Sequence, residues 1–211
     1  TLSSRQRNAS DAWSIEVDSG IIGKPYPDAL SKGTKIEVRD LFYNTPARLK
    51  FLKSPKTEQS QIVQIIKRIA MAHCNITFTL SDERKKILDL RCDYNEQTKP
   101  SINRLKMIIG KEFTENSIQV QSERDGIKLT GYASLPTLNR GNSGLQFLFV
   151  NSRPVNDRML FGALRGAYRD LLASNRYPLV ALFLEAPPNL VDVNVHPAKT
   201  EVRFQDAGIV R

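Results

Sequence analysis

Two apolar runs separated by an amphipathic stretch constrain the fold of this chain more than any other feature of its sequence. Phe147–Val150 and Leu179–Leu184 are continuous apolar runs of the length of a strand. Between them, apolar residues recur at the spacing of one helix face: Leu160, Leu164, Ala167, Tyr168, Leu171 and Leu172. A strand, a crossover helix and a second strand predict a sheet that helices cover on one face. We therefore expect an α/β (α+β) fold.

The residues on either side of this unit extend the same pattern. Residues 102–109 predict a helix, because apolar positions recur at helical spacing until a glycine stops them. Asp125-Gly126 predicts a hairpin turn between two strands. Two further segments alternate between apolar and polar residues as strands do: 191–195 and 200–204.

The first part of the chain predicts a similar mixture. Turn-forming residues dominate the first thirty positions and predict a mobile segment that leads into a strand. Regular alternation from Thr34 predicts a strand that continues through Tyr43. Ser54-Pro55 is typical of a helix start, and apolar residues at helical spacing follow it. A charged turn at residues 82–86 then separates the two strands of a hairpin.

A polar stretch between Arg91 and Ser101 has no periodic pattern and is the best candidate for a domain boundary. We therefore expect two domains, residues 1–95 and residues 96–211, each with two layers. At 211 residues the chain is long enough for both to bury a core.

The charge balance favours a polyanionic partner. The chain has 31 Lys and Arg against 22 Asp and Glu, a net charge of +9, and a pI near 9.7. The excess is spread along the chain, so that no basic tail accounts for it. Nucleic acid is the first candidate partner.

Cysteine and histidine are too few for a structural metal site. Cys74, Cys92, His73 and His196 are the complete set, and their spacing matches no common four-ligand site. Two cysteines suit a reducing compartment, with both thiols packed as small apolar groups and no disulfide framework.

The sequence also bounds the location of the protein. Its longest apolar run is far below the roughly 20 residues that a membrane helix needs, and its first residues do not resemble a signal peptide. We therefore expect no membrane partner and a cytoplasmic protein. The first methionine is Met71, so we expect that further residues preceded Thr1.

Gly33-Thr34 stands at the head of the strand that begins near residue 34. A glycine lets the backbone approach a ligand closely, and a hydroxyl can contact a phosphate or a base. A turn that enters a strand is the alternative interpretation. In residues 41–53, Pro46 predicts that the backbone approaching it is extended. The basic residues that follow are interpreted as a solvated edge above buried Leu49, Phe51 and Leu52.

Arg153 and Arg158 flank a predicted helix start that Asn156 would cap. Backbone N–H groups and the helix dipole favour an anion at such a position, which suits a phosphate of DNA or of a nucleotide. A salt bridge between Arg158 and a nearby acid is an equal alternative.

Lys199 follows a His-Pro turn at the end of a predicted strand. A lysine held by such a turn can act as a fixed charge on a terminal phosphate. A solvated loop lysine is the alternative, and His196 is interpreted as a packed or hydrogen-bonded turn residue.

The order of these stretches resembles the MutL mismatch-repair family over the whole chain. Three strings carry the resemblance: GTKIEVRDLFYNTPARLKF at residues 33–51, VNSRP at 150–154 and VDVNVHPAKTEVRF at 191–204. The family consists of GHKL-class ATPases related to gyrase. The resemblance implies that residues 1–95 are the last part of a GHKL ATPase sandwich. It also implies that residues 96–211 are a ribosomal-protein-like α/β domain with a left-handed crossover.

The resemblance assigns roles to individual residues. Gly33 and Thr34 match the final nucleotide-binding motif of the family, and Lys199 matches the lysine that reaches the γ-phosphate of ATP. ATP would then favour a docked arrangement of the two domains. Arg158 lies where MutL proteins carry basic residues implicated in DNA binding, and Arg153 is placed with it.

The departures from the family concern catalysis. The catalytic glutamate, the magnesium-binding asparagine and the Gly-Phe-Arg-Gly-Glu-Ala-Leu signature of the family have no equivalent in these 211 residues. We expect no catalytic residue, no metal ligand and no tightly bound ATP or Mg²⁺ in this chain, and no hydrolysis by it alone.

The resemblance further implies a parent protein that forms a homodimer, binds the DNA backbone without sequence specificity near the bacterial nucleoid, and works with a mismatch-recognition protein and a repair nuclease or helicase. A stand-alone DNA-binding module is the alternative. A structural dimerisation piece is a third interpretation.

Overall fold

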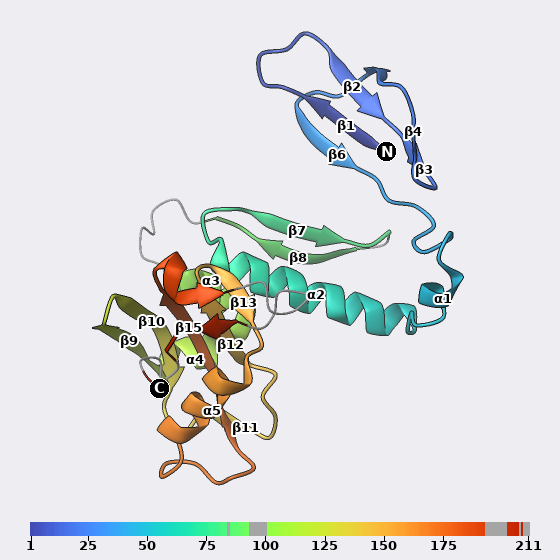
Figure 1. Cartoon of the computed structure of the whole chain (residues 1–211). Helices are drawn as coiled ribbons and strands as arrows, with labels where there is room; N and C mark the ends of the chain where they lie inside the picture. The colour runs from blue at the N-terminus through green and yellow to red at the C-terminus, as the bar shows by residue number, and fades with distance from the viewer. Residues whose placement is uncertain (84, 93–100, 193–201, 207, 209–211) are drawn as a thin grey trace. The chain divides into compact units, whose positions relative to one another are not determined.

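The computed structural model describes residues 1–83, 85–92, 101–192, 202–206 and 208, and it divides into two compact units (Figure 1). Unit 1 is Thr1–Glu58 and unit 2 is Gln59–Arg211. The predicted domain boundary between residues 95 and 96 lies within 93–100, outside the described residues, and stays a prediction. The division into compact units comes earlier, because residues 70, 71 and 90 share a core with the second half of the chain.

Unit 1 contains a four-stranded antiparallel sheet in the order β5-β2-β1-β6. Its strands are β1 (Leu2–Arg5), β2 (Ala12–Ile15), β5 (Tyr26–Asp28) and β6 (Gly33–Ile36). Between β2 and β5 in the chain, β3 (Val17–Asp18) and β4 (Ile21–Ile22) form a separate two-stranded ribbon. The prediction of a mobile segment over the first thirty residues is therefore wrong. Short strands with few apolar residues did not give a period-2 signal long enough to be recognised.

The strand predicted from Thr34 to Tyr43 is too long. β6 ends at Ile36, which pairs with Leu2 of β1, and the Glu37 amide beyond it donates to the Thr1 carbonyl oxygen. Asp40 and Phe42 then adopt φ values of 49° and 70°, which no strand residue has.

The proline of residues 41–53 was predicted to force an extended approach, and Thr45 before it is non-helical, with φ −133° and ψ 67°. Residues Pro46–Leu49 form the short helix α1, with the proline in its first turn. The three apolar residues predicted to be buried beneath a basic edge are exposed in the described structure, and Phe51 has 82% of its surface accessible.

Unit 2 is built on a five-stranded sheet in the order β13-β12-β15-β10-β9. The strands are β9 (Ser117–Arg124), β10 (Ile127–Ser134), β12 (Gln146–Val150), β13 (Arg153–Val155) and β15 (Val180–Glu185). β12 and β15 pair in parallel, and the chain passes between them through α5 (Arg158–Ala167). The other pairs are antiparallel. The mixed α/β class predicted from the two apolar runs is confirmed.

Helices cover both faces of this sheet, not one (Figure 1). Leu148 and Val150 join α5 in one core cluster, whereas Phe147 and Phe149 join a second cluster with α2 (Pro55–Ala72), α3 (Ile102–Ile109) and α4 (Lys111–Glu115). Because side chains alternate along a strand, a continuously apolar strand presents apolar groups to both faces. The one-face prediction is therefore wrong.

The predicted turns and hairpins of unit 2 are confirmed. Asp125 and Gly126 have φ values of 51° and 76°, as a two-residue hairpin turn requires. β7 (Phe78–Ser81) and β8 (Lys86–Leu90) form the second hairpin. Short elements complete the unit: β11 (Asn139–Arg140), β14 (Tyr177–Pro178), the 3-10 helix η1 (Pro188–Leu190), β16 (Val191–Asp192) and β17 (Arg203–Phe204).

The helix predicted to reach Leu172 ends at Ala167. Tyr168 leaves the helical conformation and its hydroxyl donates to the Ser134 carbonyl oxygen at 2.7 Å. The predicted cap is one residue early, since it is the Asp157 carboxylate that accepts from the Met159 and Leu160 amides.

Both cysteines are free and half-buried in the described structure. No group of three or more His, Cys, Asp or Glu residues among the described positions could hold a metal ion. None of the described helices has the length and apolar character that crossing a membrane requires.

Candidate anion-binding site

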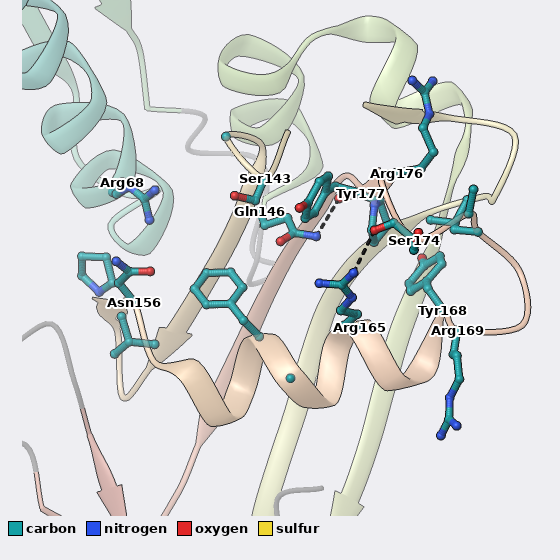
Figure 2. Close-up of a pocket in the computed structure, with 18 of the residues that line it drawn as sticks. Arg68, Ser143, Gln146, Asn156, Arg165, Tyr168, Arg169, Ser174, Arg176 and Tyr177 are labelled. Atoms are coloured by element: carbon teal, nitrogen blue, oxygen red, sulfur yellow. Dashed lines mark hydrogen bonds between the residues drawn. The ribbon is translucent and has the colours of Figure 1, made fainter. Parts of the chain in front are cut away.

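A cavity of unit 2 lies at the β13 edge of the sheet and has a volume of about 1160 Å³ (Figure 2). Its lining comes from α2, the loop before β12, β13, α5 and residues 172–178. α5 packs on one face of β12 and α2 packs on the other face, so both helices can line a cavity at the neighbouring β13 edge.

The charge of this cavity has one sign. The arginines that line it are Arg68, Arg153, Arg165, Arg169 and Arg176. Among its lining residues within the described chain there is no Asp or Glu. In Figure 2, Arg68 lies opposite Asn156 and Arg165 points toward Ser174, whereas Arg169 and Arg176 extend outward. A concave surface with cations and without carboxylates attracts anions.

Arg68 is the most buried of these cations. It projects from α2, it is half-buried, and its guanidinium carbon lies 5.2 Å from the centre of the Phe147 ring, which is 1% exposed. Burial lowers the pKa of the Arg68 guanidinium, although an arginine remains charged at neutral pH. No carboxylate of the described residues lies within ion-pair distance of it. Among the described residues, the face of the Phe147 ring is thus the group that stabilises the positive charge of Arg68.

Hydrogen bonds to backbone carbonyls orient two of the polar side chains that line the cavity. Gln146 is only 6% exposed, and its Nε2 donates to the Pro178 carbonyl oxygen at 3.3 Å. Arg165 Nη2 donates to the Ser174 carbonyl oxygen at 2.8 Å, which fixes the orientation of its guanidinium. Oriented guanidinium groups present paired N–H donors that match carboxylate and phosphate oxygens.

The two arginines predicted to bind phosphate have different positions. Arg153 is exposed on β13 and lines the cavity, whereas Arg158 is the exposed first residue of α5 and is not among the lining residues. The backbone donors of the helix start are occupied by the carboxylate of Asp157. Within the described chain neither arginine has a salt bridge.

The predicted nucleotide-binding residues belong to other parts of the chain. Gly33 begins β6 in unit 1 with a φ of 97°, which a glycine adopts without strain. The Thr34 hydroxyl lies 3.0 Å from the Ser4 hydroxyl and is exposed to solvent. Lys199 and His196 lie outside the described residues, so their predicted roles remain predictions.

The interpretation of the sequence missed most of the cavity. Arg165 and Arg169 stand four residues apart in the helix predicted to reach Leu172, which was a detectable signal, although Arg169 lies in the turn beyond the end of α5. Arg68 had no comparable signal, because a single basic residue within an amphipathic helix is usually solvated. Its position opposite β13 depends on tertiary packing.

Comparison with known proteins shows which protein family this chain resembles in sequence. Residues 105–211 match the family described as DNA mismatch repair protein, C-terminal domain. The chain is 54% identical over 211 residues to the DNA mismatch repair protein MutL of Paramagnetospirillum magneticum, and 53% identical to MutL of Rhodospirillum rubrum. The alignments cover all of this chain but 35% and 34% of those proteins, so the chain spans about a third of their length.

Solved structures give the same result for the fold. The Aquifex aeolicus MutL ATPase domain complexed with ADP superposes with a TM-score of 0.66 at 30% identity, covering 89% of this chain and 67% of that one. The N-terminal domain of a DNA repair protein superposes with a TM-score of 0.78 at 25% identity, covering 99% of this chain and 68% of that one.

Proposed function

Because this chain belongs to the MutL DNA mismatch repair family, we propose that it is the part of such a protein that binds DNA through the backbone phosphates. The observation that carries the proposal is the set of four exposed arginines around the cavity of unit 2, which no carboxylate among the described lining residues neutralises: Arg153, Arg165, Arg169 and Arg176. Arg158, the first residue of α5, is a further exposed arginine of unit 2. Contacts of this kind bind phosphate without reading base sequence.

We also propose that the parent protein uses ATP binding and hydrolysis to switch conformation. Gly33, Thr34 and Lys199 would contact the nucleotide, and Lys199 would report the presence of the γ-phosphate. Two observations support the proposal: the likeness to a MutL ATPase domain complexed with ADP, and the exposed Thr34 hydroxyl beside a glycine with positive φ. The parent would act as a homodimer at bacterial DNA, between a mismatch-recognition protein and a nuclease or helicase.

The 211-residue chain alone would not turn over ATP, because it contains no equivalent of the catalytic glutamate or the magnesium-binding asparagine of the family. The test is Mg²⁺-dependent phosphate release by the purified chain, with a full-length MutL protein as the positive control. Turnover above the no-enzyme background would contradict this part of the proposal.

The DNA-binding proposal is tested by a salt series with the chain and a short duplex. Replacement of counterions by Lys and Arg makes log Kd depend linearly on log salt concentration, with a slope of about 0.9 for each phosphate contacted. Arg158→Glu is expected to weaken binding and to lower this slope by about 1. The variant should fold, because an acid in the first turn of a helix is favourable.

Lys128→Glu is the matched control, since Lys128 is exposed on β10, three strands from β13 in the sheet order. It has the same change in charge and should leave the slope unchanged. Equal loss of affinity in both variants would show that net charge alone drives binding. No binding by the native chain at low salt would refute the proposal.

A further inference from the structure

We propose that the cavity of unit 2 receives the phosphorylated end of a DNA strand, with Arg68 in contact with the terminal phosphate. The inference deepens the proposed DNA binding and rests on it. It assigns a ligand to a half-buried cation that has no carboxylate partner among the described residues.

Arg68 needs an anion more than any other cation of the cavity does. A charged group removed from water is stabilised by pairing, and one left unpaired is costly. Arg68 is half-buried, packs on the buried Phe147 ring, and has no carboxylate partner in the described chain. The guanidinium edge toward Asn156 is where an incoming anion would bind (Figure 2).

The shape of the site favours a strand end over an internal segment. A cavity of about 1160 Å³ has the size of a site for a small ligand, and a DNA duplex is too wide to enter it. The exposed arginines, Arg153 among them, are those that a passing duplex could touch. A strand terminus can enter a site of this size with its phosphate toward Arg68.

The charge of the ligand leads to the same choice. A terminal phosphate monoester has a charge of about −1.5 to −2 at neutral pH, because its second pKa is near 6. An internal phosphodiester has a single negative charge. A half-buried guanidinium therefore gains more from the terminal group.

The remaining lining suits the nucleotide that carries this phosphate. Phe161 is half-buried in the lining and provides an aromatic face on which a base can stack. The exposed amide of Asn156 provides a donor and an acceptor that tolerate any base edge. Such a site would hold the last nucleotide of a strand without selecting its identity.

The test compares strand ends that differ by one phosphate. A ten-nucleotide single strand with a fluorophore at one end is titrated with the full 211-residue chain, and the other end is a 5′-phosphate, a 3′-phosphate or a hydroxyl. A circular single strand serves as the competitor without an end. We expect one phosphorylated end to bind about 10-fold more tightly than the hydroxyl end, as one charge-assisted contact allows.

Arg68→Gln should abolish that difference while binding of the hydroxyl oligonucleotide persists through the exposed arginines. Arg124→Gln, at the opposite edge of the sheet, is the matched control and should retain the difference. Should Arg68→Gln fail to fold by circular dichroism, Arg165→Gln replaces it, because exposed Arg165 contributes little to the core. This second variant should reduce the difference at least threefold.

Three outcomes would overturn the inference: equal affinity for phosphorylated, hydroxyl and circular strands, an unchanged difference in the folded variants, or tighter binding of an octaglutamate peptide than of the phosphorylated strand. The last result would assign the cavity to an acidic protein segment. Failure of the proposed function is distinct, because the native chain would then bind none of the oligonucleotides.

Discussion

Arg104 offers the sharpest test of how unit 2 is held together. It lies on α3, is 2% exposed, and within the described chain its guanidinium donates to backbone carbonyl oxygens. Its guanidinium donates to the carbonyl oxygens of Ala70 (3.2 Å), Cys74 (3.1 Å), Ile76 (2.7 Å) and Arg91 (3.2 Å). One side chain thus joins the C-terminal end of α2, both ends of the β7–β8 hairpin and α3.

The structure sets the magnitude of the loss in Arg104→Met. A hydrogen bond from a charged donor contributes about 1.5–3 kcal/mol when its acceptor cannot regain water. Of these bonds the one to Ala70 is buried, whereas the bonds to Cys74, Ile76 and Arg91 are part-buried, so that water can hydrate their carbonyl oxygens in the variant. Burial lowers the pKa of the Arg104 guanidinium, and this desolvation cost offsets part of the gain. We expect a loss of about 3 kcal/mol in the free energy of unfolding of unit 2.

Urea denaturation followed by circular dichroism at 222 nm measures this loss, because every described helix except α1 and the first turn of α2 belongs to unit 2. Methionine retains the packing of the arginine stem, so the difference reports the polar contacts. Arg124→Met, at an exposed position of β9, is the control and should lie within about 0.5 kcal/mol of the native chain. A loss below about 1 kcal/mol in Arg104→Met would refute the reasoning.

Three further predictions concern single positions. Asp157→Ala should destabilise unit 2 by about 1 kcal/mol in the same assay, because Asp157 caps α5, whereas Asn156→Ala should change stability little. Gly131→Ala should cost about 3 kcal/mol or more and lower the thermal midpoint, since Gly131 has a φ of 142° and an added Cβ would lie 2.1 Å from the Ala181 carbonyl oxygen. Hydrogen bonds from Ser14, Ser3 and the Ala29 amide hold the pKa of Asp28 below its ordinary value of 3.8. The stability that Asp28 contributes is therefore present above about pH 3.8 and lost as pH falls through the lower folded pKa. Fluorescence of Trp13, the single tryptophan, should report this acid transition in unit 1, and Asp28→Asn should remove its pH dependence.

The sequence predicted unit 2 better than unit 1 for a physical reason. Phe147–Val150, Leu179–Leu184 and the Asp125-Gly126 turn are strong local signals, and each corresponds to an element of the structure. The strands of unit 1 have two to four residues, so local periodicity could not distinguish them from turns. The backbone reversal at Asp40 and Phe42 has no glycine to mark it.

The candidate site was predicted only in part. Arg153 was identified from its position before a helix, and the structure places it in the cavity lining. Arg68 is separated from Arg153 by 85 positions in the numbering, and no pattern within α2 links the two. Their proximity arises from helices on both faces of the sheet, a consequence of the continuous apolar runs that the one-face prediction overlooked.

The packing of α2 also sets the order of events while the chain is made. Ala70 and Met71 share their core cluster with Phe147 and Phe149, which lie about 75 positions further along the chain. At a synthesis rate of about 5–20 residues per second, α2 leaves the ribosome roughly 4–15 s before its partners exist. During that interval its apolar side is available to chaperones and proteases. Translation pauses between codons 75 and 145 should therefore lower the yield of folded protein.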